Sequence, residues 1–341
     1  MAWSESARHG MPRRGVLNRS VDGVQLRFRP DMPENPIKHH AVELNVRNSE
    51  DRSRAANLLV TGEAPLFSLF GNIIGAFSNP QAEAVGDLNE LKGRPRTQTG
   101  SVTTSPDFYK SLVDWDAHNT DAIDPQKTLA LIEHLSRLGP IGFLLPAADH
   151  VPPHLSRPAT FAGKDVKTVQ LIVPGQQCPF GEVVGNAVRR MPDSPFIFAT
   201  SGNMSKAVTG TEQAAHHRFG PMLEEFAEEG RTGLTVLSDD EQDMWRRHPF
   251  HEPRSTTIVR LHDVHQGENG ESRDHKGRPV IEVTRHGSTH EGYLRQVLNE
   301  HGFGVAFPKD RIPERHYSIG EKVISTGRLL RANVRFGGAT V

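Results

Sequence analysis

Hydroxyl and amide side chains gather in the run Thr200-Ser201-Gly202-Asn203, directly after the apolar stretch 195–199. An apolar run that ends in small polar residues is typical of a buried strand that presents them to a ligand at its carboxyl end. Ser201 and Asn203 are two residues apart, so an extended chain directs both to the same side. A hydroxyl beside a carboxamide suits a ribose, a phosphate or a base edge. An ordinary turn after a strand is the alternative.

Cationic side chains are concentrated in Lys92-Gly93-Arg94-Pro95-Arg96. Three cations within five residues, on a backbone shaped by a glycine and a proline, predict a phosphate clamp. The alternative is basic capping of a helix C-terminus, which is common and favourable by some tenths of a kcal/mol.

Two further groups of residues are weaker candidates for a functional site. His248 and His251 form one His-x-x-His pair, and His262 and His265 form another, which together suggest four zinc ligands. Pro249 breaks the helical spacing of the first pair, and histidine is frequent in this chain, with 18 copies. We therefore predict no metal site. Cys178 has no motif around it, so we interpret it as a buried or bystander thiol rather than a nucleophile.

Composition limits the class of protein. The chain has 341 residues, 35% of them apolar, a mean hydropathy of -0.51 and a net charge of -1. A single cysteine allows no internal disulfide, which fits the reducing cytoplasm. There is no apolar signal segment and no run of about 18 apolar residues. We expect a soluble cytoplasmic protein that does not enter membranes, and binding to nucleic acid would need a local basic patch.

Strands and helices alternate along much of the chain, which predicts the α/β class. We expect a partly disordered arm over residues 1–40, a nucleotide-binding domain over 41–301 and a C-terminal extension over 302–341. Segment 146–167 is expected to be a loop. The predicted strands are 42–46, 66–76 with a glycine turn, 141–145, 168–173, 195–201, 234–237, 256–261 and 280–285. The predicted helices are 51–60, 80–91, 125–138, 181–190, 211–229 with a kink or a split at Gly220-Pro221, and 291–300.

Five motifs in order resemble the YrdC-like family of threonylcarbamoyl-AMP synthases, over roughly residues 50–290. They are Lys92-Gly93-Arg94-Pro95, the run 139–146, the run Thr200-Ser201-Gly202-Asn203-Met204-Ser205, the run 255–259 and Arg285-His286-Gly287. The resemblance implies an open twisted mixed sheet with flanking helices and a deep basic cavity.

The resemblance also implies a site for ATP and Mg²⁺. Lys92 and Arg94 would face the phosphates as the catalytic cations, and the remaining contacts would come from Thr200, Ser201, Asn203, Ser255, Thr256 and Arg285. The chemistry agrees with this set, because forming an adenylate expels pyrophosphate and needs positive charge at the phosphates.

The chain departs from the family pattern where threonine and the carbamate would lie. Leu66 replaces a threonine, Phe70 a tyrosine, Gly142 a threonine and Ile172 an arginine, although Ser68 keeps one hydroxyl. We therefore expect an adenylate-forming nucleotidyltransferase that activates another acyl or carbamoyl group from a small acid or amino acid.

Other functions stay open at this stage. A non-catalytic nucleotide- or RNA-binding module of the same fold is the main alternative, and a carbamoyl- or acyl-transferring enzyme that needs a transferase partner is another. The short basic pieces Arg13-Arg14, Arg27 and Arg29 of the arm could contact tRNA, although a solvated arm is the default interpretation.

Overall fold

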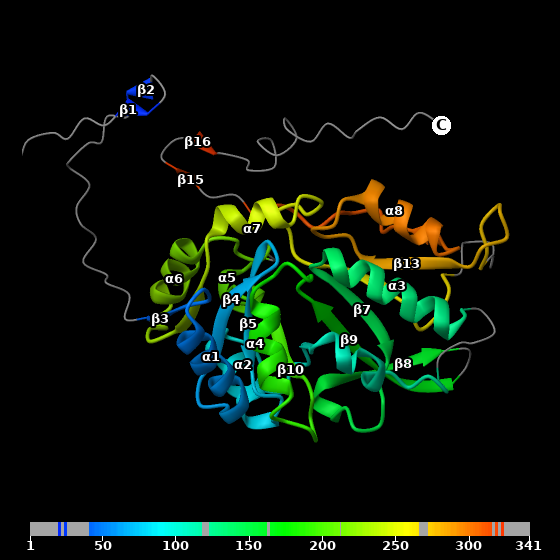
Figure 1. Cartoon of the computed structure of the whole chain (residues 1–341), viewed down its shortest axis with the longest axis horizontal. Coiled ribbons are helices and arrows are strands. Elements are labelled where there is room, and N and C mark those ends of the chain that lie inside the picture. Colours follow the sequence, from blue (N-terminus) through cyan, green and yellow to red (C-terminus); the bar gives the residue numbers. More distant parts are fainter. Residues whose placement is uncertain are drawn as a thin grey trace, which may run out of the picture. The chain divides into compact units, whose positions relative to one another are not determined.

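The computed structural model describes residues 41–117, 123–161, 164–211, 213–265 and 272–315. It also gives the backbone of two short strand pairs, β1 (Ser20–Val21) with β2 (Val24–Gln25) and β15 (Ser318–Ile319) with β16 (Lys322–Val323). Contacts divide the chain into residues 1–39 and 40–341, and the second unit is described below (Figure 1). The predicted arm and most of the predicted extension lie outside the described residues.

One mixed sheet of twelve strands organises this unit. It confirms the α/β class that the sequence predicted and the mixed sheet that the resemblance implied. Its order is β14-β13-β12-β7-β9-β6-β10-β5-β4-β11-β3, with β8 paired to β9. The pairs β11–β3, β11–β4, β6–β9, β12–β7 and β13–β14 are parallel and the other pairs antiparallel. The strands are β3 (Val42–Asn45), β4 (Leu66–Phe70), β5 (Ile73–Ser78), β6 (Ser101–Thr103), β7 (Ile141–Pro146), β8 (Ser156–Phe161), β9 (Lys164–Val173), β10 (Ile197–Ser201), β11 (Thr235–Ser238), β12 (Thr257–Arg260), β13 (Val280–Arg285) and β14 (Gly304–Ala306).

Helices flank this sheet (Figure 1). Helix α1 packs against α4, and α3 packs against α8. None of the described helices is both long and apolar enough to cross a membrane. The α-helices are α1 (Ser49–Thr61), α2 (Ala82–Leu91), α3 (Pro125–Leu138), α4 (Phe180–Val188), α5 (Lys206–Thr209), α6 (Phe219–Glu228), α7 (Glu241–Arg247) and α8 (Glu291–Glu300), and two 3₁₀ segments cover Pro106–Leu112 and Pro153–Leu155.

Helix α3 shows how local sequence sets these elements. The Asp124 carboxylate accepts hydrogen bonds from the backbone N–H groups of Gln126 and Lys127, and Pro125 occupies the first turn. Both features favour a helix start. The residues that the helix buries recur at helical spacing, namely Thr128, Leu131, Ile132, Leu135 and Ser136. The predicted bounds of this helix are confirmed.

The hairpin of β4 and β5 borders the site described below. Gly71 turns the chain with φ 64°, a left-handed conformation that suits glycine. A Cβ atom at Gly71 would lie 2.4 Å from the Pro140 ring, so the turn and the start of β7 require a residue without a side chain there. The predicted strand-turn-strand over 66–76 is confirmed and extends to Ser78.

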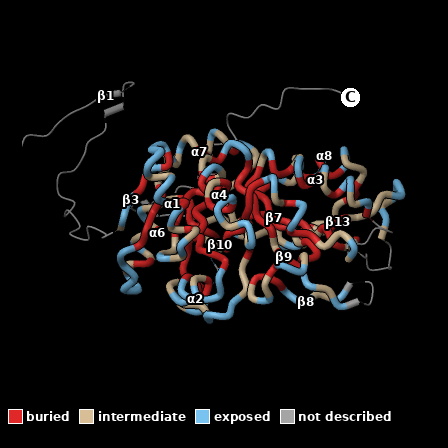
Figure 2. Tube along the Cα trace, turned by 60° about the horizontal axis from the view of Figure 1, so that its bottom comes forward, coloured by how far each residue is buried: buried red, intermediate tan, exposed pale blue. Residues whose placement is uncertain are grey.

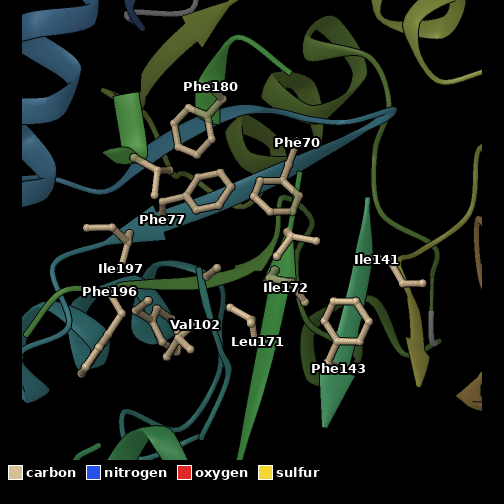
Figure 3. Packing of buried hydrophobic residues seen from close by; sticks show 14 of the residues in the cluster. Phe70, Phe77, Val102, Ile141, Phe143, Leu171, Ile172, Phe180, Phe196 and Ile197 are labelled. Carbon is tan, nitrogen blue, oxygen red and sulfur yellow. The ribbon is translucent and has the colours of Figure 1, made fainter. Parts of the chain in front are cut away.

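The core lies on both faces of the sheet (Figure 2). Phenylalanines from distant segments meet there: Phe77 of β5 and Phe180 of α4 have ring centroids 4.4 Å apart, and Phe70 lies 5.4 Å from Phe77 (Figure 3). Such aromatic pairs contribute about 0.5–1.5 kcal/mol beyond their buried area.

Two predicted elements are wrong in part, and one helix was missed. Segment 146–167 was expected to be a loop, but it contains strand β8, whose Pro158 is tolerated because β8 pairs with β9 alone. The predicted helix over 211–229 begins only at Phe219, so Pro221 stands in its first turn and causes no kink. Helix α7 was not predicted, although Asp240 caps its N-terminus.

Candidate functional site

A pocket of about 470 Å³ lies over the central strands of the sheet. Its walls come from the β4–β5 hairpin, the loop after α2, the strands β6, β8, β9 and β10, and the segments that begin β12 and end β13. Of the residues predicted from the sequence, it brings together Arg94, Thr200, Ser201, Asn203, Ser255, Thr256 and Arg285.

The loop after β10 forms one side of the pocket. Ser201 pairs with Gly75 of β5, and the Gly202 N–H donates to the Ile74 carbonyl at 2.8 Å, which continues the strand pairing into the loop. Asn203 is buried, and its Nδ2 donates to the Met204 carbonyl at 2.8 Å. Its carbonyl oxygen Oδ1 has no hydrogen-bond partner. A buried acceptor left open beside a pocket is available to a ligand donor.

The loop after α2 supplies a guanidinium to the same side. Arg94 Nη1 donates to Thr200 Oγ1 at 2.7 Å, and burial lowers the pKa of Arg94. The loop is fixed to the segment after β10, because Ser205 Oγ donates to the Gly93 carbonyl at 2.7 Å and the Ser205 N–H donates to the Lys92 carbonyl at 3.0 Å. Arg94 is thus held at the pocket by two loops that are distant in sequence.

Lys92 does not lie where the sequence suggested. Its side chain is fully buried, it does not line the pocket, and its ammonium donates to Thr200 Oγ1 at 3.2 Å and to the Ser201 carbonyl. Burial, with Arg94 as the next cause, lowers the pKa of Lys92 well below its ordinary value of 10.5. Lys92 therefore supports Thr200 and Ser201 from behind the lining, and its contact with a phosphate stays a prediction.

Arg96 also departs from the predicted clamp. It forms ion pairs with Asp87 at 2.8 Å and Glu90 at 2.6 Å, on the outside of α2. The helix-capping interpretation therefore fits Arg96 better than phosphate binding does. Of the three cations in the motif, Arg94 alone lines the pocket.

The opposite side of the pocket is built by the start of β12 and the end of β13. Arg285 Nε donates to the Thr256 carbonyl at 2.8 Å, which couples the two segments. Ser255 Oγ accepts from the Ala215 N–H at 3.3 Å. Thr257 Oγ1 accepts from the N–H groups of Gly287 and Thr289 at 3.1 and 3.0 Å, so the turn after Arg285 is fixed on β12.

Sequence reasoning missed several polar lining residues, among them Arg157, Lys206 and Gln213. Arg157 of β8 donates from Nη2 to the Thr99 carbonyl at 3.2 Å, and Lys206 and Gln213 follow the Asn203 loop. Arg157 was missed because its segment was expected to be a loop, and no motif marked the other two. Arg94, Arg157, Lys206 and Arg285 make the pocket basic, and no described lining residue is acidic.

The four residues that depart from the family pattern lie in two kinds of place, at or beside the pocket and in the core. Phe70 and Ile172 line the pocket, and Gly142 lies beside Ile172 on the neighbouring strand. Leu66 is buried in the core. Ser68, which keeps a hydroxyl, donates it to the Leu237 carbonyl at 3.2 Å and does not line the pocket.

The rival sites have structural explanations. His248 Nδ1 lies 2.8 Å from the Gly139 carbonyl and His262 Nδ1 lies 3.3 Å from the Leu144 carbonyl. Across the described ranges, no group of three or more His, Cys, Asp or Glu side chains is placed to hold a metal ion. Cys178 is buried against the Leu69 carbonyl, and burial raises its pKa to about 11, so its thiol is unsuited to nucleophilic attack.

Comparisons with known proteins agree with this architecture. No protein-family model and no curated protein sequence matches the chain. Among solved structures, a double variant of P. abyssi Sua5 matches with a TM-score of 0.52 and 16% identity over 78% of this chain and 65% of that one. P. abyssi Sua5 complexed with L-threonine gives 0.49 and 16% over 78% and 62%, and full-length HypF in its phosphate- and nucleotide-bound form gives 0.41 and 14% over 70% and 29%.

The fold is therefore that of a divergent YrdC-like α/β protein. The likeness extends over just under two thirds of the length of the Sua5 chains. At this level of identity it shows the fold that the five motifs predicted.

Proposed function

We propose that this protein is an adenylate-forming nucleotidyltransferase that joins a small carboxylic or carbamic acid to the AMP part of ATP and releases pyrophosphate. The acyl or carbamoyl group would then pass to a tRNA or to the substrate of a transferase partner. The fold shared with Sua5 supports the coarse class, and the pocket supports the assignment of residues.

The observation that carries the proposal is the convergence of Arg94, Asn203 and Arg285 on one basic pocket. The open Oδ1 of Asn203 can accept a hydrogen bond from a ribose hydroxyl or a base amino group. Arg94 and Arg285 can neutralise phosphate oxygens, because a guanidinium group binds phosphate through bidentate hydrogen bonds. A nucleotide can use all three residues at once, because its ribose or base can pair with Asn203 while its phosphates pair with Arg94 and Arg285.

The catalytic role that we propose for Arg94 is charge stabilisation. The acid attacks the α-phosphorus, and negative charge grows on the departing pyrophosphate. A fixed cation at those oxygens stabilises the transition state more than the ground state. Lys92 acts indirectly, because its ammonium holds Thr200 and Ser201 in place.

Mg²⁺ fits this pocket poorly as a protein-bound ion. Mg²⁺ is usually held by one or two carboxylates together with substrate phosphates. The described lining residues offer hydroxyls such as Ser201 and Thr256 but no carboxylate. We therefore propose that any Mg²⁺ enters with the triphosphate, and we assign it no ligand from the described chain.

Calorimetric titration with ATP and with AMP, each with and without Mg²⁺, tests the nucleotide site. We expect binding of both nucleotides, and a loss of at least tenfold in affinity for Asn203→Ala, which corresponds to about 1.4 kcal/mol. Asn57→Ala, at an exposed position on α1, is the matched control and should bind as the unmodified protein does. Equal affinity for both variants would exclude Asn203 from the site.

A non-catalytic nucleotide-binding module is the second candidate function. The position of Lys92 behind the pocket favours it. Of the cations in the run 92–96, only Arg94 is then placed to contact phosphates. Pyrophosphate release in the presence of a panel of acids separates the candidates. Nucleotide binding without release under any acid would favour the module.

A further inference from the structure

The inner wall of the pocket is apolar, in contrast to its basic rim. It is formed by Phe70, Ile73 and Phe77 of the β4–β5 hairpin and by Ile172 of β9. Figure 3 shows Phe70 and Phe77 beside each other, with Ile172 close to Phe70. All four are less than 10% exposed, so they form a packed surface rather than mobile side chains.

On the β7 side, the strand neighbours of Ile172 add no polar group to this wall. Gly142 lies opposite Ile172 on β7, and Ile258 of β12 lies opposite Gly142. A Cβ atom at Gly142 would come within 2.3 Å of Ile258 Cδ1 and 3.0 Å of Ile172 Cγ2. The two isoleucines therefore close over the glycine, and three adjacent strands present only aliphatic atoms at this place.

Two polar side chains near this wall are already engaged. Gln170, which lines the pocket two residues before Ile172, donates from Nε2 to Ser101 Oγ, and Ser68, which lies outside the lining, donates its hydroxyl to the Leu237 carbonyl. A hydroxylated or charged acceptor group placed against Phe70 and Ile172 would lose its water without gaining partners there. An aliphatic or aromatic group makes no hydrogen bonds to water, so placing it there leaves no hydrogen bond unsatisfied.

We infer that the acid activated in this pocket is an apolar carboxylic acid, such as a short branched aliphatic or an aromatic acid. The inference rests on the proposed function and specifies its substrate class. The carboxylate lies toward the cations of the rim, and the hydrocarbon part lies against Phe70, Ile73 and Ile172.

The reaction balances without a further reactant. A carboxylate oxygen forms a bond to the α-phosphorus of ATP. The bond from that phosphorus to the oxygen that bridges to the β-phosphorus breaks, and pyrophosphate leaves with the electron pair. The products are an acyl-adenylate and pyrophosphate, and no atom is oxidised or reduced.

Exchange of labelled pyrophosphate into ATP tests the inference on the full chain. The probes are isovalerate and benzoate against lactate, threonine, and threonine with bicarbonate. We expect the two apolar acids to support exchange at least tenfold faster than the polar ones, because one buried methylene alone can change specificity 10–200-fold.

Ile172→Thr is the informative variant, since it keeps the branched shape and adds a hydroxyl to the wall. We expect it to raise KM for isovalerate severalfold and to leave KM for ATP unchanged. Val166→Thr also adds a hydroxyl to a β-branched side chain on the same strand, away from this pocket, and should alter neither KM.

Different experimental outcomes would overturn the substrate class and the proposed function. ATP binding with exchange best supported by threonine and bicarbonate, or by none of the acids, would overturn the apolar substrate class and leave the nucleotide site standing. Absence of ATP and AMP binding would overturn the proposed function, and the substrate class with it.

Discussion

Arg94 donates a hydrogen bond from Nη1 to Thr200 Oγ1 at 2.7 Å, across 106 residues of sequence. The same oxygen accepts from Lys92 Nζ at 3.2 Å, so one hydroxyl joins the cation that lines the pocket to the cation behind it. Thr200 can accept both bonds through its two lone pairs and still donate its own proton to a ligand.

Thr200→Val tests this junction. Removing the oxygen leaves both cations without this acceptor, and we expect ATP affinity to fall by about 1–3 kcal/mol, the usual cost of an unsatisfied hydrogen bond. Thr200→Ser retains the oxygen and should bind ATP nearly as the unmodified protein does. Calorimetry on both variants is the measurement. A loss of affinity in Thr200→Ser with none in Thr200→Val would show that the methyl group rather than the hydroxyl matters.

The lowered pKa of Lys92 predicts a pH dependence of stability. Its pKa in the unfolded chain is near 10.5, and in the folded chain it lies well below. Between these values the unfolded state binds more protons, so the free energy of unfolding rises as the pH increases toward 10.5. Urea titrations at pH 8 and pH 10 should show this rise, and Lys92→Met should reduce it. Lys127→Met, at an exposed position on α3, should leave it intact.

The buried histidines predict sensitivity to acid. Burial, followed by the neighbouring His248, lowers the pKa of His251 to about 3. The folded state keeps this ring neutral, so its contribution to stability is complete above pH 6.5 and is lost as the pH falls from 6.5 toward 3. We expect His251→Gln to flatten the decline of the unfolding free energy between pH 6.5 and 5. The exposed His275→Gln should not, and identical curves for both variants would contradict the assignment.

Gly287 predicts a steric requirement next to Arg285. A Cβ atom there would lie 1.9 Å from the Ser255 carbonyl oxygen, a backbone atom that cannot move aside cheaply. We expect Gly287→Ala to destabilise the fold by at least about 2 kcal/mol and to weaken ATP binding by displacing Ser255 and Thr256. Gly220→Ala has no atom within 4 Å of the new carbon, and thermal unfolding should show little change.

Local sequence signals determine much of the secondary structure. Asp124 and Pro125 start α3 at the predicted residue, and Gly71 places the turn between β4 and β5. These features act within a few residues, through caps and backbone conformation, so they can be read from the chain alone. Strand β8 was not predicted, because Pro158 argues against a strand unless the strand is known to lie at the edge of the sheet.

The types of the candidate site residues were readable, but their placement was not. Sequence order and the family resemblance pointed to Arg94, Asn203 and Arg285, and these line one pocket. The same reasoning put Lys92 at the phosphates, whereas the fold buries its ammonium against Thr200 and Ser201. Only the tertiary structure could decide this, because a lysine's reach and pKa depend on which distant segments surround it.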